Sequence, residues 1–342
     1  MLNTKRIRKS FPAVKSGRLV SNNAASTQIP AQLLDLMKKL SKDYDNVHRG
    51  QSSSSVAMTE LFESSYDTIA QFIGANSRKN IILYRNTTEA INAVMYSLLT
   101  EFRDGDNIVT TYMEHNSNYV PWYGMTREIL PKFGINVECR LAKFDKDTGK
   151  LDLGHLRSLV NERTKLVCCT GASNFLGTKN PLRELREIAD ASGYVQLTGE
   201  KRSYLLIDGA QTVPNIHIDM KDADMDFLAW SFHKIISPFG VGALYAKEKL
   251  LENMRPFLYG GDMIAEGMVT PEKVEYNSLP WKFTAGTPNI LGTILSAQGL
   301  RLLMDFSLGA KKPYYFMTGK DLDVEDIREA MENIEEHEKE LV

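Results

Sequence analysis

The stretch YLLIDGAQTVPNIHIDMKDADMDFLAWSFHKIISPFGVGALYA, residues 204–246, decides the fold. It contains three apolar runs, Tyr204–Ala210, Asp226–Phe232 and Gly242–Ala246. Their apolar residues are largely continuous rather than alternating, which is typical of strands buried on both faces of a mainly parallel sheet. Only a short segment separates the last two runs, and this allows those two strands to pair antiparallel.

The same pattern continues upstream. Four further strands are expected, at Asn80–Arg85, Asn107–Tyr112, Ile135–Leu141 and Lys165–Gly171. Helical patterns lie between most of the runs, at Thr87–Leu99, Asn118–Lys132, Leu151–Val160 and Pro181–Ala191. Because strand and helix alternate, the sequence predicts a doubly wound α/β fold with a mainly parallel, seven-stranded sheet.

Two other regions interrupt or extend this pattern. Gly50 with the serine tetrad Ser52–Ser55 predicts a flexible loop, and Gly309–Gly319 breaks the periodicity with glycine and proline. Beyond it, apolar residues recur at near-helical spacing up to Leu341, and Asp321 or Asp323 can cap that helix. The apolar stripe of this helix has no obvious partner downstream.

Composition narrows the function classes. The 342 residues are 43% hydrophobic and 25% charged, with a net charge of −2, so nothing suggests nucleic acid or a membrane as partner. The three cysteines, Cys139, Cys168 and Cys169, have no metal-site spacing and favour a cytoplasmic protein. The first 34 residues are basic and lack acids, which fits either a transit peptide or a solvated arm.

Polar residues with chemical potential gather at the ends of the expected strands. Asp208 ends one buried strand, where doubly wound folds bind ligands, and Gln211 follows it. Ser231 ends the next, followed by His233 and Lys234 and then a turn rich in glycine. An isolated His-Lys pair usually lies in a solvent-exposed loop. Here an acid at the end of the preceding strand and glycines after the lysine favour a functional lysine.

These residues match the needs of pyridoxal 5′-phosphate (PLP), which requires a lysine, a carboxylate for its pyridine nitrogen, phosphate donors and a stacking group. Lys234 and Asp208 supply the first two. Thr87 and Thr88 open a helix after a strand and form a phosphate cradle. Ser231 and His233 add donors. His115 can stack on the ring, although alone it is as readily a helix-capping residue.

The chain resembles the class V aminotransferase family, fold type I with an aspartate-aminotransferase-like large domain, in its cysteine desulfurase and selenocysteine lyase branch. The resemblance runs from Ile7 to about Asp305. Its segments, in family order, are IRKSFPAV, NNAAST, VHRG, NTTEAIN, GDNIV, MEHNSNYVPW, SNFLGTKNPL, the DGAQ to SFHK block and FTAGTPNI. Because the resemblance begins at Ile7, it favours an N-terminal arm over a transit peptide.

The resemblance implies a role for each site residue. Lys234 is the Schiff-base lysine and general base, Asp208 pairs with the pyridinium and His115 stacks on the ring. Gln211 and Asn174 address the ring hydroxyl and the substrate. The implied phosphate ligands are Thr87, Thr88, Ser231 and His233, with Thr287 reaching the phosphate of a neighbouring subunit.

Organisation and partners follow from the same resemblance. It implies an arm at 1–30, a PLP-binding large domain at 31–305 and the start of an apparently incomplete small domain at 306–342. It also implies a homodimer with shared active sites, an amino-acid substrate and, as a further partner, a sulfur-acceptor protein.

The resemblance weakens where sulfur chemistry would be carried out. The family places a nucleophilic cysteine and a substrate-binding arginine in a later segment, and the cysteines of this chain lie in expected core strands. Tyr194–Ser203 is a polar insertion, and Asn22 stands where the family has an acid. Three hypotheses stay open: a desulfurase-like lyase, another class V activity (transaminase, epimerase or kynureninase-like), or a non-catalytic PLP-fold protein. We expect PLP binding but little desulfurase turnover from these 342 residues.

Overall fold

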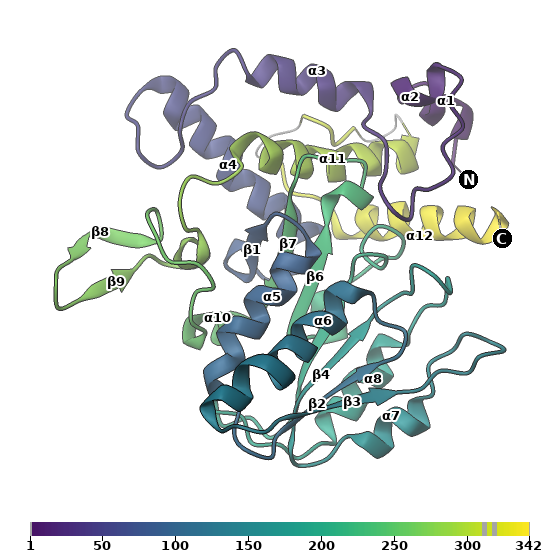
Figure 1. Ribbon diagram of the computed structural model, residues 1–342. Coiled ribbons are helices and arrows are strands. Elements are labelled where there is room, and N and C mark those ends of the chain that lie inside the picture. The colour runs from purple at the N-terminus through teal and green to yellow at the C-terminus, as the bar shows by residue number, and fades with distance from the viewer. Residues whose placement is uncertain (1, 310–312, 317–319, 342) are drawn as a thin grey trace.

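A computed structural model describes residues 2–309, 313–316 and 320–341 (Figure 1). Its centre is a seven-stranded sheet in the order β1-β7-β6-β5-β4-β2-β3. The strands are β1 (Ile81–Tyr84), β2 (Asn107–Thr111), β3 (Glu138–Ala142), β4 (Thr164–Thr170), β5 (Tyr204–Asp208), β6 (Phe227–Ser231) and β7 (Gly242–Ala246). The predicted doubly wound α/β fold is therefore confirmed. Each predicted strand is present, β7 with the predicted bounds and the others shortened or shifted.

Strand direction also agrees with the sequence pattern. The ladders β3·β2, β2·β4, β4·β5 and β5·β6 are parallel, whereas β7 pairs antiparallel with β6 and with β1. The antiparallel pair expected from the short segment between β6 and β7 is confirmed. Since β7 is reversed between them, β1 and β6 run in the same direction, so the carboxyl ends of β1, β2, β4, β5 and β6 share one edge.

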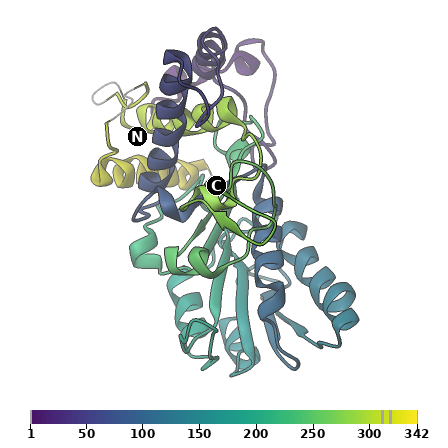
Figure 2. The ribbon, with the colours of Figure 1, turned by 90° about the vertical axis from the view of Figure 1, so that its left-hand side faces the viewer.

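Helices cover both faces of this sheet. The helices are α1 (Thr4–Arg8), α2 (Pro12–Lys15), α3 (Ala31–Leu40), α4 (Ser53–Phe72), α5 (Thr87–Leu98), α6 (Asn116–Gly124), α7 (Leu153–Leu159), α8 (Leu182–Asp190), α9 (Met220–Ala223), α10 (Glu248–Asn253), α11 (Ile290–Leu308) and α12 (Val324–Leu341). One core cluster joins α4, α7 and α8 to the sheet, and a second joins α5, α6 and α10 to its other face. Figures 1 and 2 show α3, α4, α11 and α12 gathered at one end.

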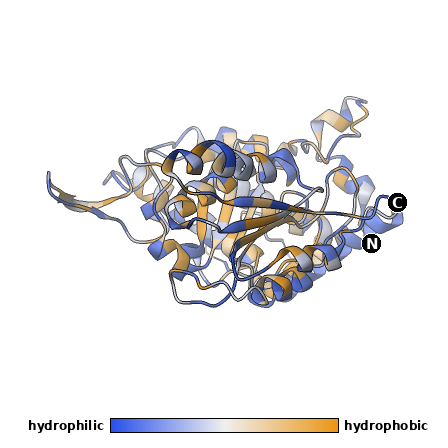
Figure 3. Cartoon of the chain, turned by 60° about the horizontal axis from the view of Figure 1, so that its bottom comes forward, coloured by the Kyte–Doolittle hydropathy of each residue, from blue (hydrophilic) through white to orange (hydrophobic). Residues whose placement is uncertain are grey.

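Alternation along a strand explains the adjacent cysteines. On β4, Cys168 packs into the α5–α6 cluster and Cys169 into the α4–α8 cluster, because successive side chains point to opposite faces. Both thiols are fully buried. Figure 3 shows the same layering, with hydrophobic strands inside and hydrophilic residues along the outer helices.

Two expectations outside the sheet need comment. The flexible loop predicted at Ser52–Ser55 is wrong, because Ser52 caps α4 by accepting from Ser55 N at 3.1 Å and the following serines form its first turn. Serine is a favoured N-cap, so the polar tetrad marks a helix start. Asp323 caps α12 as expected, accepting from Asp326 N at 3.1 Å. Of the predicted break at 309–319, residues 310–312 and 317–319 lie outside the described residues.

The apolar stripe of α12 finds its partner upstream. Ile327, Ala330 and Met331 are buried in the cluster that also contains Leu300 and Met304 of α11. The partner is therefore a helix that precedes α12 in the chain, whereas the expectation considered only a downstream one.

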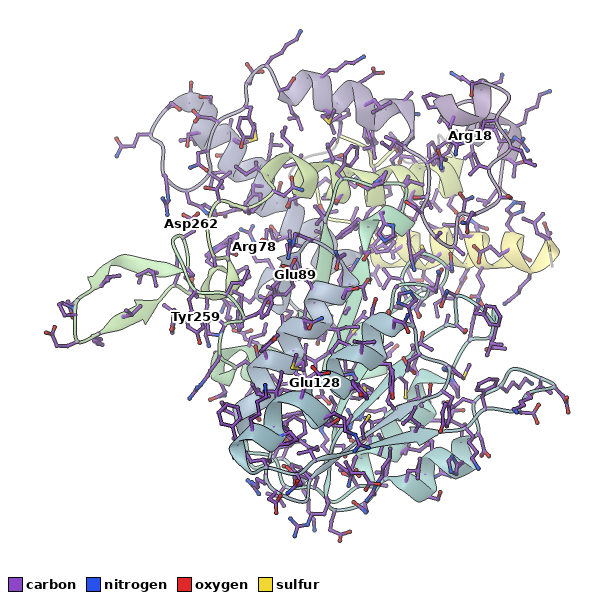
Figure 4. The ribbon with its side chains drawn as sticks, viewed as in Figure 1. Arg18, Arg78, Glu89, Glu128, Tyr259 and Asp262 are labelled. Atoms are coloured by element: carbon purple, nitrogen blue, oxygen red, sulfur yellow. The ribbon has the colours of Figure 1, made fainter. Side chains whose placement is uncertain are left out.

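A two-stranded hairpin of β8 (Ile264–Val269) and β9 (Val274–Tyr276) extends away from the sheet (Figure 1). The ion pair between Arg49 Nη2 and Asp262, at 2.5 Å, fixes its base to the loop before α4. Asp262 and Tyr259 both lie at this base (Figure 4). Among the described residues, no helix is long and apolar enough to span a bilayer.

Candidate active site

A cavity of about 420 Å³ opens at the shared carboxyl edge of the strands. Parallel folds of this class bind ligands at this edge. Its walls come from the N-terminal segment, the first turns of α5 and α6, and the loops after β4, β5 and β6. The lining residues are Ala24, Ala25, Asn86, Thr87, Thr88, His115, Ser117, Thr170, Ala172, Asn174, Asp208, Ala210, Gln211, Ser231, His233 and Lys234.

Lys234 lies in a short 3₁₀ turn, Phe232–Lys234, directly after β6. The carbonyl of His233 accepts hydrogen bonds from Thr27 N at 2.8 Å and from Thr27 Oγ1 at 2.9 Å. The N-terminal segment therefore fixes the turn that carries the lysine. Burial lowers the pKa of Lys234, and the Asp208 carboxylate opposes that shift. A lowered pKa favours the neutral, nucleophilic amine.

Asp208 ends β5 and is 3% exposed. Its Oδ1 accepts a hydrogen bond from Ala210 N at 3.0 Å. Burial raises the pKa of Asp208, whereas the Ala210 hydrogen bond, Lys234 and His115 lower it. A buried carboxylate on a cavity wall can stabilise a cation placed against it, because an opposite charge offsets the cost of burial.

Hydroxyl groups and a helix N-terminus form a polar pocket beside Lys234. Thr87 N donates to Ser231 Oγ at 2.7 Å, and the two hydroxyls lie 2.6 Å apart. Asn86 caps α5 by accepting from Glu89 N at 2.9 Å. A Cβ on Gly242 of β7 would lie 2.5 Å from the Asn86 backbone, so glycine allows this turn to approach the sheet. Helix N-termini attract anions through free N–H groups and the helix dipole.

His115 is the N-cap of α6, and its ring lies on the cavity wall. Its Nδ1 accepts a hydrogen bond from Ser117 N at 3.1 Å. Ser117 Oγ also lies 2.7 Å from Thr88 Oγ1, which joins the first turns of α5 and α6. The capping role and the cavity position therefore occur together in one residue.

The structure brings all but one of the sequence-predicted site residues to this cavity. Asn174 and Gln211 line it, and Gln211 Nε2 donates to Ala24 O at 2.7 Å. Thr287 is exposed and lies outside the lining of the cavity. Sequence reasoning missed the anchoring roles of Ser26 and Thr27 and the contact made by Ser117. The NNAAST and EHNSN motifs contain these residues, but neither motif reveals which distant backbone group they reach.

The cysteines do not belong to this cavity. Cys168 and Cys169 are fully buried, and burial raises the pKa of both thiols well above its ordinary value. Cys139 on β3 is partly buried, and burial raises its pKa to about 11. Thiols of this kind are protonated at neutral pH and react slowly.

Comparisons with known proteins give the family. The model of the class-V aminotransferase family matches residues 20–315. A cysteine desulfurase of Haloferax volcanii is 39% identical over 290 residues, which cover 84% of this chain and 64% of that relative. This chain therefore spans about two thirds of the length of the curated relatives it matches.

Solved structures agree in fold. The apo structure of a cysteine desulfurase from Thermococcus onnurineus superposes with a TM-score of 0.80 at 31% identity, covering 90% of this chain and 72% of that one. A mutant of the lyase C-DES with glycine covalently linked to its PLP cofactor matches at a TM-score of 0.71 and 18% identity, covering 85% and 73%. Sequence and fold together place this chain in the class-V aminotransferase family, among relatives that are cysteine desulfurases.

Proposed function

We propose that this chain binds PLP through Lys234 and acts on an amino acid in the manner of a cysteine desulfurase. The observation that carries the proposal is the convergence of Lys234, Asp208, His115 and the Thr87–Ser231 hydroxyl pair on one cavity. They come from four separate segments, and each has a chemical role toward one part of the same cofactor.

The residues present fit the cofactor. Ser231, Thr87 and the N-terminus of α5 would hold its phosphate, and Asp208 would hold its ring nitrogen protonated. His115 would lie against the ring, and Asn174 with Gln211 would contact the ring hydroxyl and the substrate. When bound, PLP supplies an electron sink that stabilises negative charge at the substrate α-carbon. Lys234 Nζ is the group that would attach the cofactor and then accept the substrate α-proton.

Sulfur transfer is the step that this set of residues supports least. It needs a thiolate that can reach the substrate sulfur, and no cysteine lines the cavity as described. We propose that the 342-residue chain attaches PLP and binds amino acids but releases little sulfide from cysteine. A sulfur-acceptor protein would therefore receive sulfur from this site only if a reactive thiol reaches the cavity.

The test is to load the protein with PLP, add cysteine and a reductant, and measure sulfide and alanine together. We expect a borohydride-trapped cofactor and sulfide at the level of free PLP. Robust sulfide release that is lost on replacing one of the three cysteines would show that the nucleophile is among them. Turnover of a non-sulfur amino acid without sulfide would favour another class V activity, and absence of trapped cofactor would favour a non-catalytic protein.

We also propose a homodimer in which Thr287 completes the phosphate site of the partner. The support is the exposed position of Thr287 outside its own cavity, in a loop where Gly286 has φ +77°. Sedimentation should give a dimer, and Thr287→Ala should weaken PLP retention without changing the association state. A monomeric protein that retains PLP as tightly as the dimer would contradict the shared site.

A further inference from the structure

Glu114 is a buried acid that the proposed chemistry does not use. It lies between the end of β2 and the first turn of α6, next to His115 in the chain. Its Oε1 accepts from Thr111 Oγ1 at 2.6 Å and from Thr170 N at 3.0 Å. Its Oε2 accepts from Asn118 Nδ2 at 2.6 Å. The carboxylate therefore joins three separate elements: β2, β4 and α6.

The direction of two of these hydrogen bonds is determined by a second neighbour. Met113 N donates to Thr111 Oγ1 at 3.0 Å, so the threonine proton points to Glu114. Trp122 Nε1 donates to the Asn118 oxygen at 3.3 Å, so the amide nitrogen of Asn118 faces Glu114. Thr170 N can only donate. All three partners thus need an acceptor at Glu114, and both of its oxygens can accept freely only in the ionised form, which predominates above its raised pKa of about 8.

The three anchored elements are those that place the proposed ring site. The β2–β4 ladder runs from Asn107/Thr164 to Val109/Val167, and Glu114 binds the N–H of Thr170 beyond its end. Thr170 pairs directly with Asp208 in the β4–β5 ladder. His115 follows Glu114 and caps α6, the helix that Asn118 belongs to. One side chain therefore connects the residue next to His115 with the strand that pairs with Asp208.

We propose that Glu114 is a positioning residue, which holds His115 and the Asp208 strand end at the separation that accepts the cofactor ring. This inference rests on the proposed binding of PLP in the cavity. Burial raises the pKa of Glu114 to about 8, with Asp208 acting in the same direction, and its three donors lower it. The donors therefore offset part of the cost of keeping this charge buried.

The test measures binding of the cofactor ring and binding of phosphate separately. The probes are deoxypyridoxine 5′-phosphate, which has the ring but cannot bond covalently to a lysine, and inorganic phosphate. Glu114→Gln keeps an acceptor for Thr111 and Thr170 but turns an N–H toward Asn118. Above pH 8, where Glu114 is ionised, we expect this variant to weaken binding of the ring compound about tenfold, the effect of losing one hydrogen bond to a charged group, and to leave phosphate binding unchanged.

A double replacement supplies the rescue. In E114Q/N118D, the amide at position 114 can donate to the carboxylate at position 118, which still accepts from Trp122 Nε1. We expect affinity for the ring compound to return to within about twofold of the starting protein. Glu101→Gln is the matched control, since Glu101 is a largely buried acid paired with Lys165 at the opposite edge of the sheet. It should lower the unfolding midpoint without changing either affinity.

Three results would overturn the inference: unchanged ring affinity in E114Q, an equal loss for ring and phosphate, or a double variant no better than E114Q. A starting protein that binds the ring compound no more tightly than phosphate would instead overturn the cofactor proposal, and the role of Glu114 with it. The two failures are therefore distinguishable in one set of titrations.

Discussion

At the amino edge of the parallel strands, Asp226 is fully buried and accepts from Arg186 at 2.7 Å, Arg202 at 3.2 Å and the Leu205 N–H at 2.8 Å. At the carboxyl edge of the same sheet, the side-chain nitrogen of Lys234 makes no hydrogen bond within residues 2–309, 313–316 and 320–341, and Asp208 borders an open cavity. Paired buried charges contribute to a unique fold, whereas unpaired ones at a cavity wall are available to a ligand.

A second buried cation at the amino edge strengthens the contrast. Lys165 is fully buried, lies 3.1 Å from Glu101 and 3.2 Å from Gln196, and has three aromatic rings within 6 Å. Gln196 belongs to the polar insertion at Tyr194–Ser203, which turns back on itself through a Val195–Lys201 bridge. The insertion therefore completes the charge pairing of the amino edge and lies far along the strands from the cavity.

The largest expected effect is at the carboxyl edge. Lys234→Ala should abolish the borohydride-trapped link to PLP and lower any turnover by about 10⁴-fold or more, because both the attachment point and the base are lost. Peptide mapping after borohydride reduction measures the link. Lys79→Ala, an exposed cation paired with Glu248, is the control. A label on another lysine would show that the site is assigned wrongly.

The next largest effect comes from removing the paired acid at the amino edge. Asp226→Ala should lower the free energy of unfolding by about 3–5 kcal/mol, because it leaves Arg186 and the neighbouring cations buried without their partner. Urea unfolding of the PLP-free protein measures the loss. The protein that remains folded should still trap PLP at Lys234. A loss below about 1 kcal/mol would mean that the buried ion pairs of Asp226 contribute no more to stability than exposed pairs do.

Asp208→Asn, in contrast to Asp226→Ala, should raise the free energy of unfolding. It should also lower turnover about a hundredfold. The raised pKa of Asp208 means that its ionised form is less favourable in the folded protein than in the unfolded chain. That cost is absent well below pH 3.8 and grows as pH rises from there to the pKa of the folded protein. The stability of Asp208→Asn relative to the unchanged PLP-free protein should therefore rise with pH, as measured by thermal unfolding from pH 3 to pH 8. If the stability difference between the two proteins does not change with pH, then the buried charge of Asp208 does not destabilise the fold.

The smallest effect concerns an ion pair between the loop after β4 and helix α12. Lys179 Nζ lies 2.8 Å from Glu335 of α12, and this hydrogen bond lowers the pKa of Glu335. Both side chains are partly exposed, so Glu335→Gln should cost only about 0.2–1 kcal/mol. A lowered pKa means that the contribution is present above pH 4.5 and is lost as pH falls through the pKa of the folded protein. It should also weaken in 1 M salt. Arg183→Gln, which removes an exposed pair within α8, is the control.

Much of the fold was predictable because its strands are buried. A central parallel strand such as β4 or β5 appears in the sequence as a continuous apolar run, and the residue after it lies at a known edge. This is why Asp208, Ser231 and Lys234 could be placed together. Helix α4 was missed because its N-cap and the first three residues of its first turn are serines. The β8–β9 hairpin was missed because its strands show no clear alternation of apolar and polar residues.

The roles of several polar residues could not be predicted, because their partners are distant in the chain. Thr27 anchors the carbonyl of His233 across 206 residues, and Gln211 reaches Ala24 across 187. Local patterns carry no information on such pairs. Thr287 is a different case: its expected partner is another chain, so its role stays a prediction.

The approximate strand positions, the class of the fold and most of the residues that line the cavity could be predicted from the sequence, because buried strands have continuous apolar runs and polar residues follow them. Only the tertiary structure decided which charges are paired. Asp208 follows its apolar run and Asp226 precedes its own, so the sequence places them at opposite edges of the sheet, but it does not show which cations reach either acid. That difference depends on the strand order and on Arg186, Arg202 and Lys247, which converge on Asp226 from three separate segments.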